Sequence, residues 1–304
     1  MILILDILIL LILPFIMLGV IKKTKAFWGG RKGAPVLQPL YDVVRLMKKE
    51  TVYSDTTSFV FRISPLINFA VIVLASLFVP LISGYSIFDI PFAFIIFSYI
   101  LGFGKFFYLI ASLDTGSSFE GMGASREACF STIVEPAFFI AMASIIALTK
   151  ITTFESLKMI LENSGIYGIL ITILAVVTLF IMLLIEGCRV PVDDPATHLE
   201  LTMIHEVMIL DNSGADLGFI LWGSALKMFL FGALISALII PASLPVWLFG
   251  ILFIISILLI AFIIGTIESS IARFRMTHIF EFIFIMSITA LLILTLVTYR
   301  IYGN

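Results

Sequence analysis

The sequence has 304 residues, of which 61% are hydrophobic and only 12% are charged, and its mean hydropathy is +1.21. A soluble domain carries roughly a quarter charged residues, so this composition excludes a soluble globular protein. The net charge of −2 provides no global basic surface for nucleic acid.

The apolar runs predict an all-α, polytopic membrane protein with a single domain over residues 1–304. Runs such as GILFIISILLIAFIIG do not alternate as barrel strands do, and they reach the roughly 18–20 residues that cross a bilayer as helix. The first run lacks a preceding basic segment and a cleavage site, so we expect a span and not a signal peptide. The predicted spans are about 1–21, 60–82, 90–112, 131–149, 167–187, 217–240, 244–264 and 280–300.

The connections between these spans divide the basic residues unequally. One side, with connections 22–59, 113–130, 188–216 and 265–279, carries most of the lysines and arginines. The other side has only Lys150, Lys158 and Arg300. The positive-inside rule therefore predicts that the first side, which also has the longer loops, is cytoplasmic and that both termini face outward.

The segment LYDVVRLMKKE in the first long connection predicts an amphipathic helix. Its expected apolar face consists of Leu40, Val43, Val44 and Met47, and its polar face of Asp42, Arg45, Lys48 and Lys49. Such a helix fits the bilayer surface or a docking face for a cytoplasmic partner, and both interpretations stay open.

Ionisable residues fall within or beside the predicted spans, where a charge costs at least ~2.5–3.5 kcal/mol and usually faces a cavity or a partner. They are Lys105, Glu135, Glu186, Lys227 and Glu281. One interpretation is structural ion pairs or groups that reach the interface. The other is a proton path, because buried carboxylates can exchange protons near neutral pH.

The stretch EGCRVPVDDPATHLELTMIHE, residues 186–206, concentrates ionisable groups directly after an uncharged run. Its prolines end the fifth span, and Asp194 followed by Pro195 predicts the start of an amphipathic helix that reaches about Leu210. One face of that helix is expected to hold His198, Thr202, His205 and Glu206. Glu200 points into the apolar arc and needs a partner, for which the candidates are Arg189, Arg273 and Arg275.

This segment does not predict a metal site or a hydrolase. His198 and His205 are seven residues apart rather than four, and no cysteine is near them. The two cysteines of the chain, Cys129 and Cys188, match no metal-ligand spacing.

Four stretches, in order along most of the chain, resemble subunit 1 of respiratory complex I. EGCRVPVDDPATHLEL resembles that family's E-x-x-R-x-P-x-D-x-P-E-A-E-x-E-L through Glu186, Arg189, Pro191, Asp193, Pro195, Glu200 and Leu201. VLQPLYDVVRLMKKE resembles L-Q-P-x-x-D-x-x-K-L-x-x-K-E through Gln38, Pro39, Asp42, Leu46, Lys49 and Glu50. ASREACFSTIVEP resembles L-R-x-x-x-Q-x-x-x-x-E through Arg126 and Glu135, and ARFRM resembles the basic loop before the last span.

The positions at which this sequence departs from the complex I patterns resemble one branch of the same superfamily. Ala196 and His198 stand where the quinone enzymes carry acids. DDPATHLELTMIHE and GGRKGAPVLQPLYD are instead similar to the membrane-anchor subunit of energy-converting NiFe hydrogenases, of the formate hydrogenlyase subunit 4, hydrogenase-4 component C and Ech types.

The resemblance implies a non-catalytic, multi-pass subunit of the cytoplasmic membrane that links hydrogenase chemistry to proton translocation. Its implied partners are a hydrogenase large subunit, an iron–sulfur small subunit, antiporter-like membrane subunits and membrane lipid, without nucleic acid. The NiFe centre and the iron–sulfur clusters would lie on those partners, with no cofactor or metal bound by this chain.

Together with the positions above, the resemblance predicts three groups of functional residues. The proton-path or coupling group is Glu135, Glu186, Glu200, Lys105, Lys227 and Glu281. The loop that faces the large subunit includes Arg189, Pro191, Asp193, Asp194, Pro195, His198, His205 and Glu206. The docking group is Gln38, Asp42, Arg45, Glu50, Arg126, Arg273 and Arg275.

Two alternatives remain. Subunit 1 of a quinone- or methanophenazine-reducing complex is the nearer one, and the missing acids at Ala196 and His198 argue against it. A stand-alone secondary transporter is the other, although the sequence shows no obvious inverted repeat or interrupted pair of helices.

Overall fold

The computed structural model describes residues 2–163, 165–194 and 203–302, in which every regular element is a helix. Eight helices are long and apolar enough to cross a membrane, which confirms the predicted polytopic all-α fold. They are α1 (Ile2–Trp28), α3 (Phe59–Ser76), α4 (Ala93–Asp114), α5 (Ser118–Thr149), α7 (Gly165–Glu186), α8 (Gly214–Ile239), α9 (Val246–Ser270) and α10 (Met276–Tyr302). The shorter elements are α2 (Gln38–Leu46), α6 (Ser156–Asn163) and the 3₁₀ helix η1 (Glu206–Ile209).

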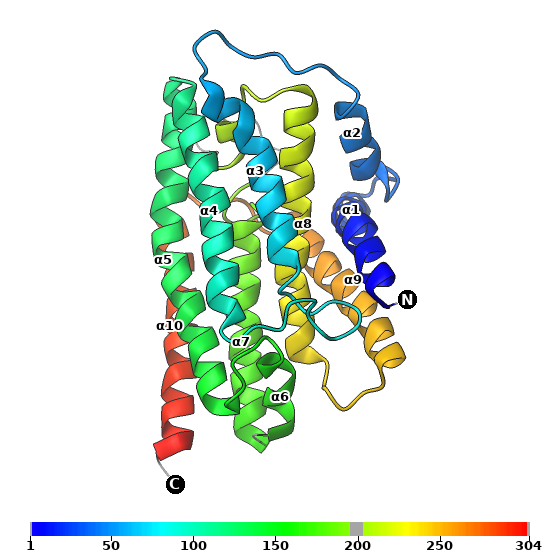
Figure 1. The fold of residues 1–304 in the computed structure, drawn as a ribbon, viewed down its shortest axis with the longest axis vertical. Helices are drawn as coiled ribbons and strands as arrows, with labels where there is room; N and C mark the ends of the chain where they lie inside the picture. The colour runs from blue at the N-terminus through cyan, green and yellow to red at the C-terminus, as the bar shows by residue number, and fades with distance from the viewer. Residues whose placement is uncertain (1, 164, 195–202, 303–304) are drawn as a thin grey trace.

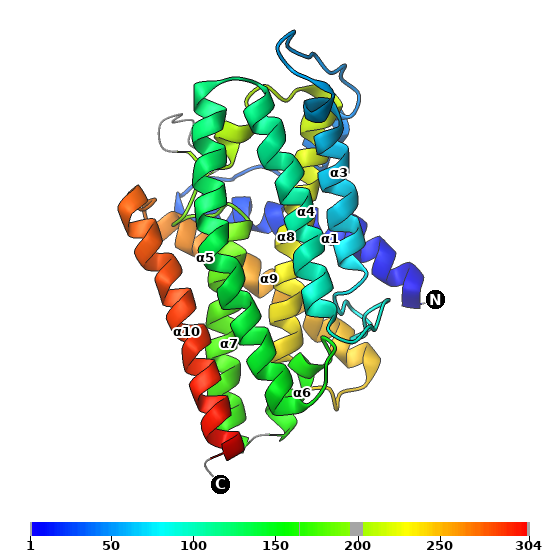
Figure 2. The same cartoon turned by 60° about the vertical axis from the view of Figure 1, so that its left-hand side comes forward.

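Most of the long helices run along one axis of the molecule (Figure 1). The clearest exception is α1, which lies across the bundle (Figure 2) and packs against α9 and α8, and α9 itself runs obliquely to the axis (Figure 1). The interior contains α8, which contacts α3, α7, α9 and α1 and buries Phe229, Phe231 and Leu234 completely. A helix that is apolar over most of its surface belongs in such a position, because it has no continuous polar face to turn toward water.

The fourth predicted span is shorter than the helix that forms. The sequence predicts a cytoplasmic connection over 113–130, and the structure corrects its local form, because α5 begins at Ser118 and most of this stretch is helical. The extra turns contain Glu120, Arg126 and Glu127, whose charges suggested a loop. In the structure these side chains face other parts of the protein, which lets the helix continue.

The amphipathic segment after α1 forms the predicted helix, α2, but only part of its predicted apolar face packs against the bundle. Pro39 and Val43 are buried against α1 and α8, whereas Val44 is 44% exposed. Val44, which the prediction places on the apolar face beside Val43, thus does not pack against the bundle. The residues that precede α2 pass over Gly19 of α1, where the backbone of Val36 lies directly against the helix.

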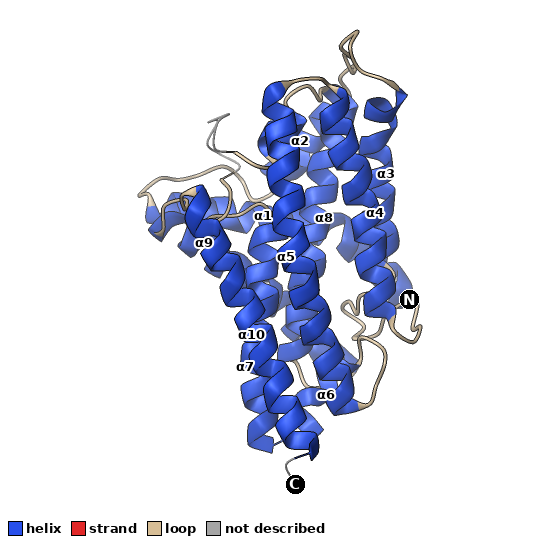
Figure 3. Ribbon diagram, turned by 90° about the vertical axis from the view of Figure 1, so that its left-hand side faces the viewer, coloured by secondary structure: helices blue, strands red, loops and turns tan. Residues whose placement is uncertain are grey.

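After α7 ends at Glu186, residues 187–194 form no regular helix, and Figure 3 draws such segments in tan. The predictions for Pro195, His198 and Glu200 lie outside the described residues, as does most of the amphipathic helix predicted from Pro195. Its described end is the 3₁₀ helix η1 rather than α-helix. Met203, Ile204 and the apolar residues of η1 are buried, packed on α4 and α5.

Candidate functional site

Four charged side chains from four helices meet inside the bundle, and we call them the buried charge cluster: Lys105, Glu127, Glu186 and Lys227. The ammonium group of Lys105 lies 2.7 Å from Glu186 Oε1 and 3.4 Å from Glu127 Oε1. The ammonium group of Lys227 lies 3.1 Å from the second oxygen, Glu186 Oε2. Glu186 is only 6% exposed. Two cations and two carboxylates thus compensate one another, as charges in an apolar interior require.

A line of polar groups continues from the buried charge cluster along α5. Glu127, Ser131 and Glu135 are spaced by four residues and therefore share one face of the helix. The Ser131 hydroxyl accepts a hydrogen bond of 2.8 Å from Lys105. Glu135 lies within electrostatic reach of Lys105, but it makes no ion pair within 4 Å in the part of the chain that the structure describes.

On its other side, the buried charge cluster adjoins Tyr108 and His205. A space of about 20 Å³ is lined by these two residues together with all four members of the cluster. A polar space of this size is about what one water molecule needs. The Tyr108 and His205 rings stack with centroids 5.1 Å apart, and Tyr108 Oη lies 3.4 Å from His205 Nε2. The segment between α7 and α8 therefore reaches the buried charge cluster through His205.

Burial of its imidazole, assisted by the positive charge of Lys227, lowers the pKa of His205 from 6.5 to about 4. Between these two values the unfolded chain binds a proton that the folded chain does not. The contribution of His205 to stability is therefore fully present above about pH 6.5 and is lost as the pH falls toward 4, by at most ~1.4 kcal/mol per pH unit.

We expect this pH dependence to be visible in the unfolding of the detergent-solubilised chain between pH 4 and pH 8. His205→Gln should make the slope of stability against pH shallower over that range. His278→Gln removes a surface imidazole and serves as the control. If stability changed with pH equally in the wild type and in His205→Gln, that result would contradict the burial of a neutral imidazole at His205.

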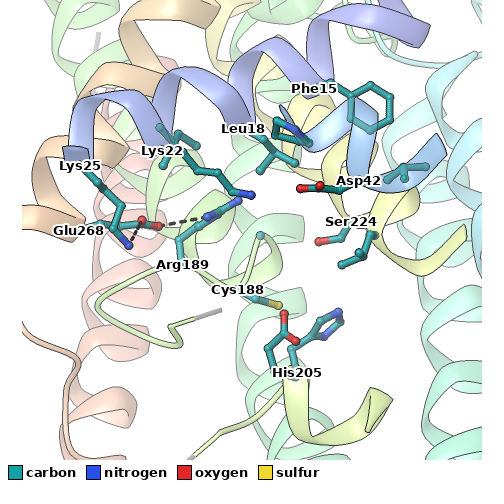
Figure 4. Close-up of a pocket in the computed structure, with 16 residues that line it drawn as sticks. Phe15, Leu18, Lys22, Lys25, Asp42, Cys188, Arg189, His205, Ser224 and Glu268 are labelled. Carbon is teal, nitrogen blue, oxygen red and sulfur yellow. Dashed lines mark hydrogen bonds and ion pairs between the residues drawn. The ribbon is translucent and has the colours of Figure 1, made fainter. Parts of the chain in front are cut away.

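A larger cavity, of about 480 Å³, lies between α1, α2, α8 and the connection after α7 (Figure 4). Its apolar wall comes from Phe15, Leu18, Ile21, Pro39, Val43 and Leu221. Its polar end contains Lys22, Lys25, Asp42, Arg189, His205, Glu206 and Glu268. Because His205 lines both this cavity and the small space above, it stands between the cavity and the buried charge cluster. The arrangement suits an occupant with an apolar body and a polar end.

Glu268 of α9 holds the polar end of this cavity together. Its side chain is fully buried and lies 3.0 Å from Lys25 of α1 and 3.4 Å from Arg189 of the connection after α7. Figure 4 shows these three side chains side by side. Arg189, a predicted candidate partner for Glu200, pairs with Glu268, and Glu200 itself lies outside the described residues.

Asp193 organises the connection between α7 and α8. One of its oxygens accepts hydrogen bonds from the backbone N–H groups of Ile204 and His205, at 3.1 and 2.9 Å. The other lies 3.3 Å from Arg273 of the α9–α10 connection. From α5, Arg126 donates a 2.8 Å hydrogen bond to the carbonyl of Met203. The predicted docking residues Arg126 and Arg273 therefore hold this chain's own connection in place.

Several predicted site residues lie apart from the buried charge cluster. Glu281 is 72% exposed and pairs with His278 at 2.9 Å. Arg45, Glu50 and Arg275 are exposed, and Gln38 donates a hydrogen bond to Asp42 within α2. Lys105, Glu186 and Lys227, by contrast, are brought into contact as a group.

Sequence reasoning missed two acids, Glu127 and Glu268, because both fall in predicted loops. The spacing of Glu127 from Ser131 and Glu135 would have placed all three on one face if the fourth span had been extended toward its N-terminus. Glu268 follows the seventh predicted span, 244–264, by only a few residues. No local signal distinguishes it from a surface acid.

The fold and the site define a multi-pass membrane protein with a compensated charge cluster in its interior and an amphipathic cavity beside it. The sequence model described as NADH dehydrogenase matches residues 1–299, and the chain belongs to this family, that of NADH dehydrogenase subunit 1. The predicted family is therefore confirmed.

Relatives include two subunits of Escherichia coli (strain K12). Hydrogenase-4 component C is 29% identical over 237 residues, covering 77% of this chain and 73% of the relative. Formate hydrogenlyase subunit 4 is 24% identical over 265 residues, covering 85% of both. A chain of the membrane-bound sulfane sulfur reductase, an archaeal respiratory membrane complex, has a similar fold with a TM-score of 0.79. That match covers 96% of this chain and 98% of the other at 16% identity.

Proposed function

We propose that this chain is the membrane-anchoring and proton-coupling subunit of a membrane-bound NiFe hydrogenase complex. The observation that carries the proposal is that the buried charge cluster shares one small space with His205, a residue of the connection between α7 and α8. Two relatives named as hydrogenase-4 component C and formate hydrogenlyase subunit 4 support the hydrogenase assignment. In this proposal the redox cofactors lie on partner subunits, and the long connections, including the one between α7 and α8, are on the cytoplasmic side that faces them.

The coupling step follows from the order of contacts. A partner that moves the connection acts first on Asp193, whose carboxylate holds the backbone of His205. His205 in turn stacks on Tyr108 beside Lys227 and Glu186. A shift of either ring changes the field on the buried charge cluster and hence the distribution of its protons. Glu135, which lies beyond the two compensated pairs, is the carboxyl group that exchanges a proton.

Purification of the tagged chain from its native membranes in mild detergent tests this function. We expect a complex that contains nickel and iron and evolves hydrogen from a reduced donor. Isolation of the chain alone, active in solute transport, would select the stand-alone transporter instead. A multisubunit complex without nickel would remove the hydrogenase assignment but leave the membrane-anchor role.

The 480 Å³ cavity favours a second candidate, subunit 1 of a quinone- or methanophenazine-reducing complex. Its apolar wall and charged end suit a molecule with an isoprenoid tail and a reducible head. The same purified complex distinguishes the two candidates. Quinone-dependent electron transfer without hydrogen evolution would select this one.

A further inference from the structure

We propose that a basic pocket at the end of α1 binds the headgroup of an anionic phospholipid. The pocket has a volume of about 400 Å³ and lies between the last turns of α1 and the side of α9. Its lining is Lys23, Thr24, Phe27, Arg31, Lys32 and Phe262. It shares no lining residue with the 480 Å³ cavity and is therefore a separate site.

The charge of this basic pocket is uncompensated. Its lining contains three cations and no carboxylate. None of the three makes an ion pair within 4 Å to the residues that the structure describes, whereas the neighbouring Lys25 pairs with Glu268 at 3.0 Å. The Thr24 hydroxyl donates to the carbonyl of Val20, within its own helix. Three cations around one hollow are complementary to a phosphodiester anion.

The backbone after α1 is built so that it brings the cations together. It folds back on the helix, with the Arg31 N–H donating to the Ala26 carbonyl at 2.8 Å. Gly33 has a φ of +67°, and a Cβ atom there would lie 2.6 Å from the Cβ of Ala26. Only glycine tolerates both conditions, so the turn holds Arg31 and Lys32 close to the last turns of α1, beside Lys23.

The aromatic residues place this pocket at the level of lipid headgroups. Phe27 and Phe262 are 70% and 49% exposed and form its apolar wall. Beside them, Trp28 donates a hydrogen bond of 3.2 Å to Thr266 of α9. A tryptophan and a group of cations at the end of a spanning helix are typical of the membrane–water interface. In a bound phospholipid, the cations thus face the phosphate and the phenyl rings face the acyl chains. A free phosphate would leave the phenyl rings without a partner.

Native mass spectrometry of the purified protein in mixed micelles tests this proposal. We expect the wild type to retain dioleoylphosphatidylglycerol in preference to dioleoylphosphatidylcholine. Each cation near the surface contributes about fivefold in affinity, so Lys23→Gln/Arg31→Gln/Lys32→Gln should bind the anionic lipid about a hundredfold more weakly. The matched control, Arg45→Gln/Lys48→Gln/Lys49→Gln, removes three exposed cations in and just after α2, and it should bind the anionic lipid as the wild type does.

A second variant separates the shape of the pocket from its charge. Gly33→Ala keeps every cation but forces the turn away from Ala26, and it should also bind the anionic lipid more weakly. Four results would overturn the proposal: equal retention of the two lipids, equal loss in the control triple variant, undiminished affinity in Gly33→Ala, or displacement of the lipid by millimolar inorganic phosphate. Absence of the lipid from the intact complex would assign the pocket to a protein partner instead.

Discussion

Replacing Glu186 with glutamine should abolish coupled proton translocation and destabilise the chain. The two oxygens of this carboxylate pair separately with Lys105 and Lys227, at 2.7 and 3.1 Å, and the residue is 6% exposed. Glutamine keeps the shape but leaves two buried ammonium groups with Glu127 as their only carboxylate partner within the described cluster. Breaking a buried ion pair by removing one partner costs about 3–5 kcal/mol.

Two readouts separate the consequences of this change. Proton uptake by inverted vesicles during hydrogen evolution reports coupling, and thermal unfolding in detergent reports stability. The control is Glu281→Gln, which removes the charge of an exposed acid at the start of α10. It should change proton uptake and thermal unfolding very little. The double variant Glu186→Gln/Lys227→Met restores the charge balance and should recover stability without recovering coupling. A single variant that unfolds and translocates like the wild type would contradict the role of the buried charge cluster.

Gly19→Ala should cost at least about 1–3 kcal/mol of stability, because it inserts a methyl group where two backbone segments touch. A Cβ at Gly19 would overlap the carbonyl oxygen of Val36 and lie 2.9 Å from the Cα of Val36. Backbone atoms cannot rotate aside as a flexible side chain can. The segment before α2 must therefore lift off α1, and α2 with its buried Val43 is pulled from the cavity wall.

Unfolding measurements and thiol labelling check this expectation. Gly102→Ala is the matched control, because nothing lies within 4 Å of a Cβ there and alanine is favoured in a helix interior by about 0.5–1 kcal/mol. Burial raises the pKa of the Cys188 thiol, which lines the cavity, so it should react slowly in the wild type and faster in Gly19→Ala. A Cys129→Ser background removes the exposed cysteine. Equal unfolding of the two alanine variants, with slow labelling in both, would contradict the close approach.

The eight spans could be predicted because length and hydropathy determine which segments can cross a bilayer. The interior charges Lys105, Glu186 and Lys227 could be identified for the same reason, since a charge in such a segment needs a partner. Which residues supply those partners could not be predicted. Glu127 pairs with Lys105 of a different helix, a relation set by tertiary packing alone.

Helix boundaries and helix faces were the weaker predictions, and for related reasons. A charged residue at the edge of an apolar run suggests the end of a span, yet α5 continues through Glu127 because that acid turns inward. On α2, Val43 and Val44 are adjacent and point about 100° apart, so a small rotation decides which one is buried. Packing against α1 and α8 selects Val43.

The ion pairs of Glu268 also order the biogenesis of this protein. Lys25 leaves the ribosome with the first helix and Arg189 after the fifth span, but their common carboxylate is on α9. Until that helix has been synthesised, neither cation can pair with this carboxylate. The polar end of the cavity therefore closes late in synthesis, after most of the bundle has been laid down.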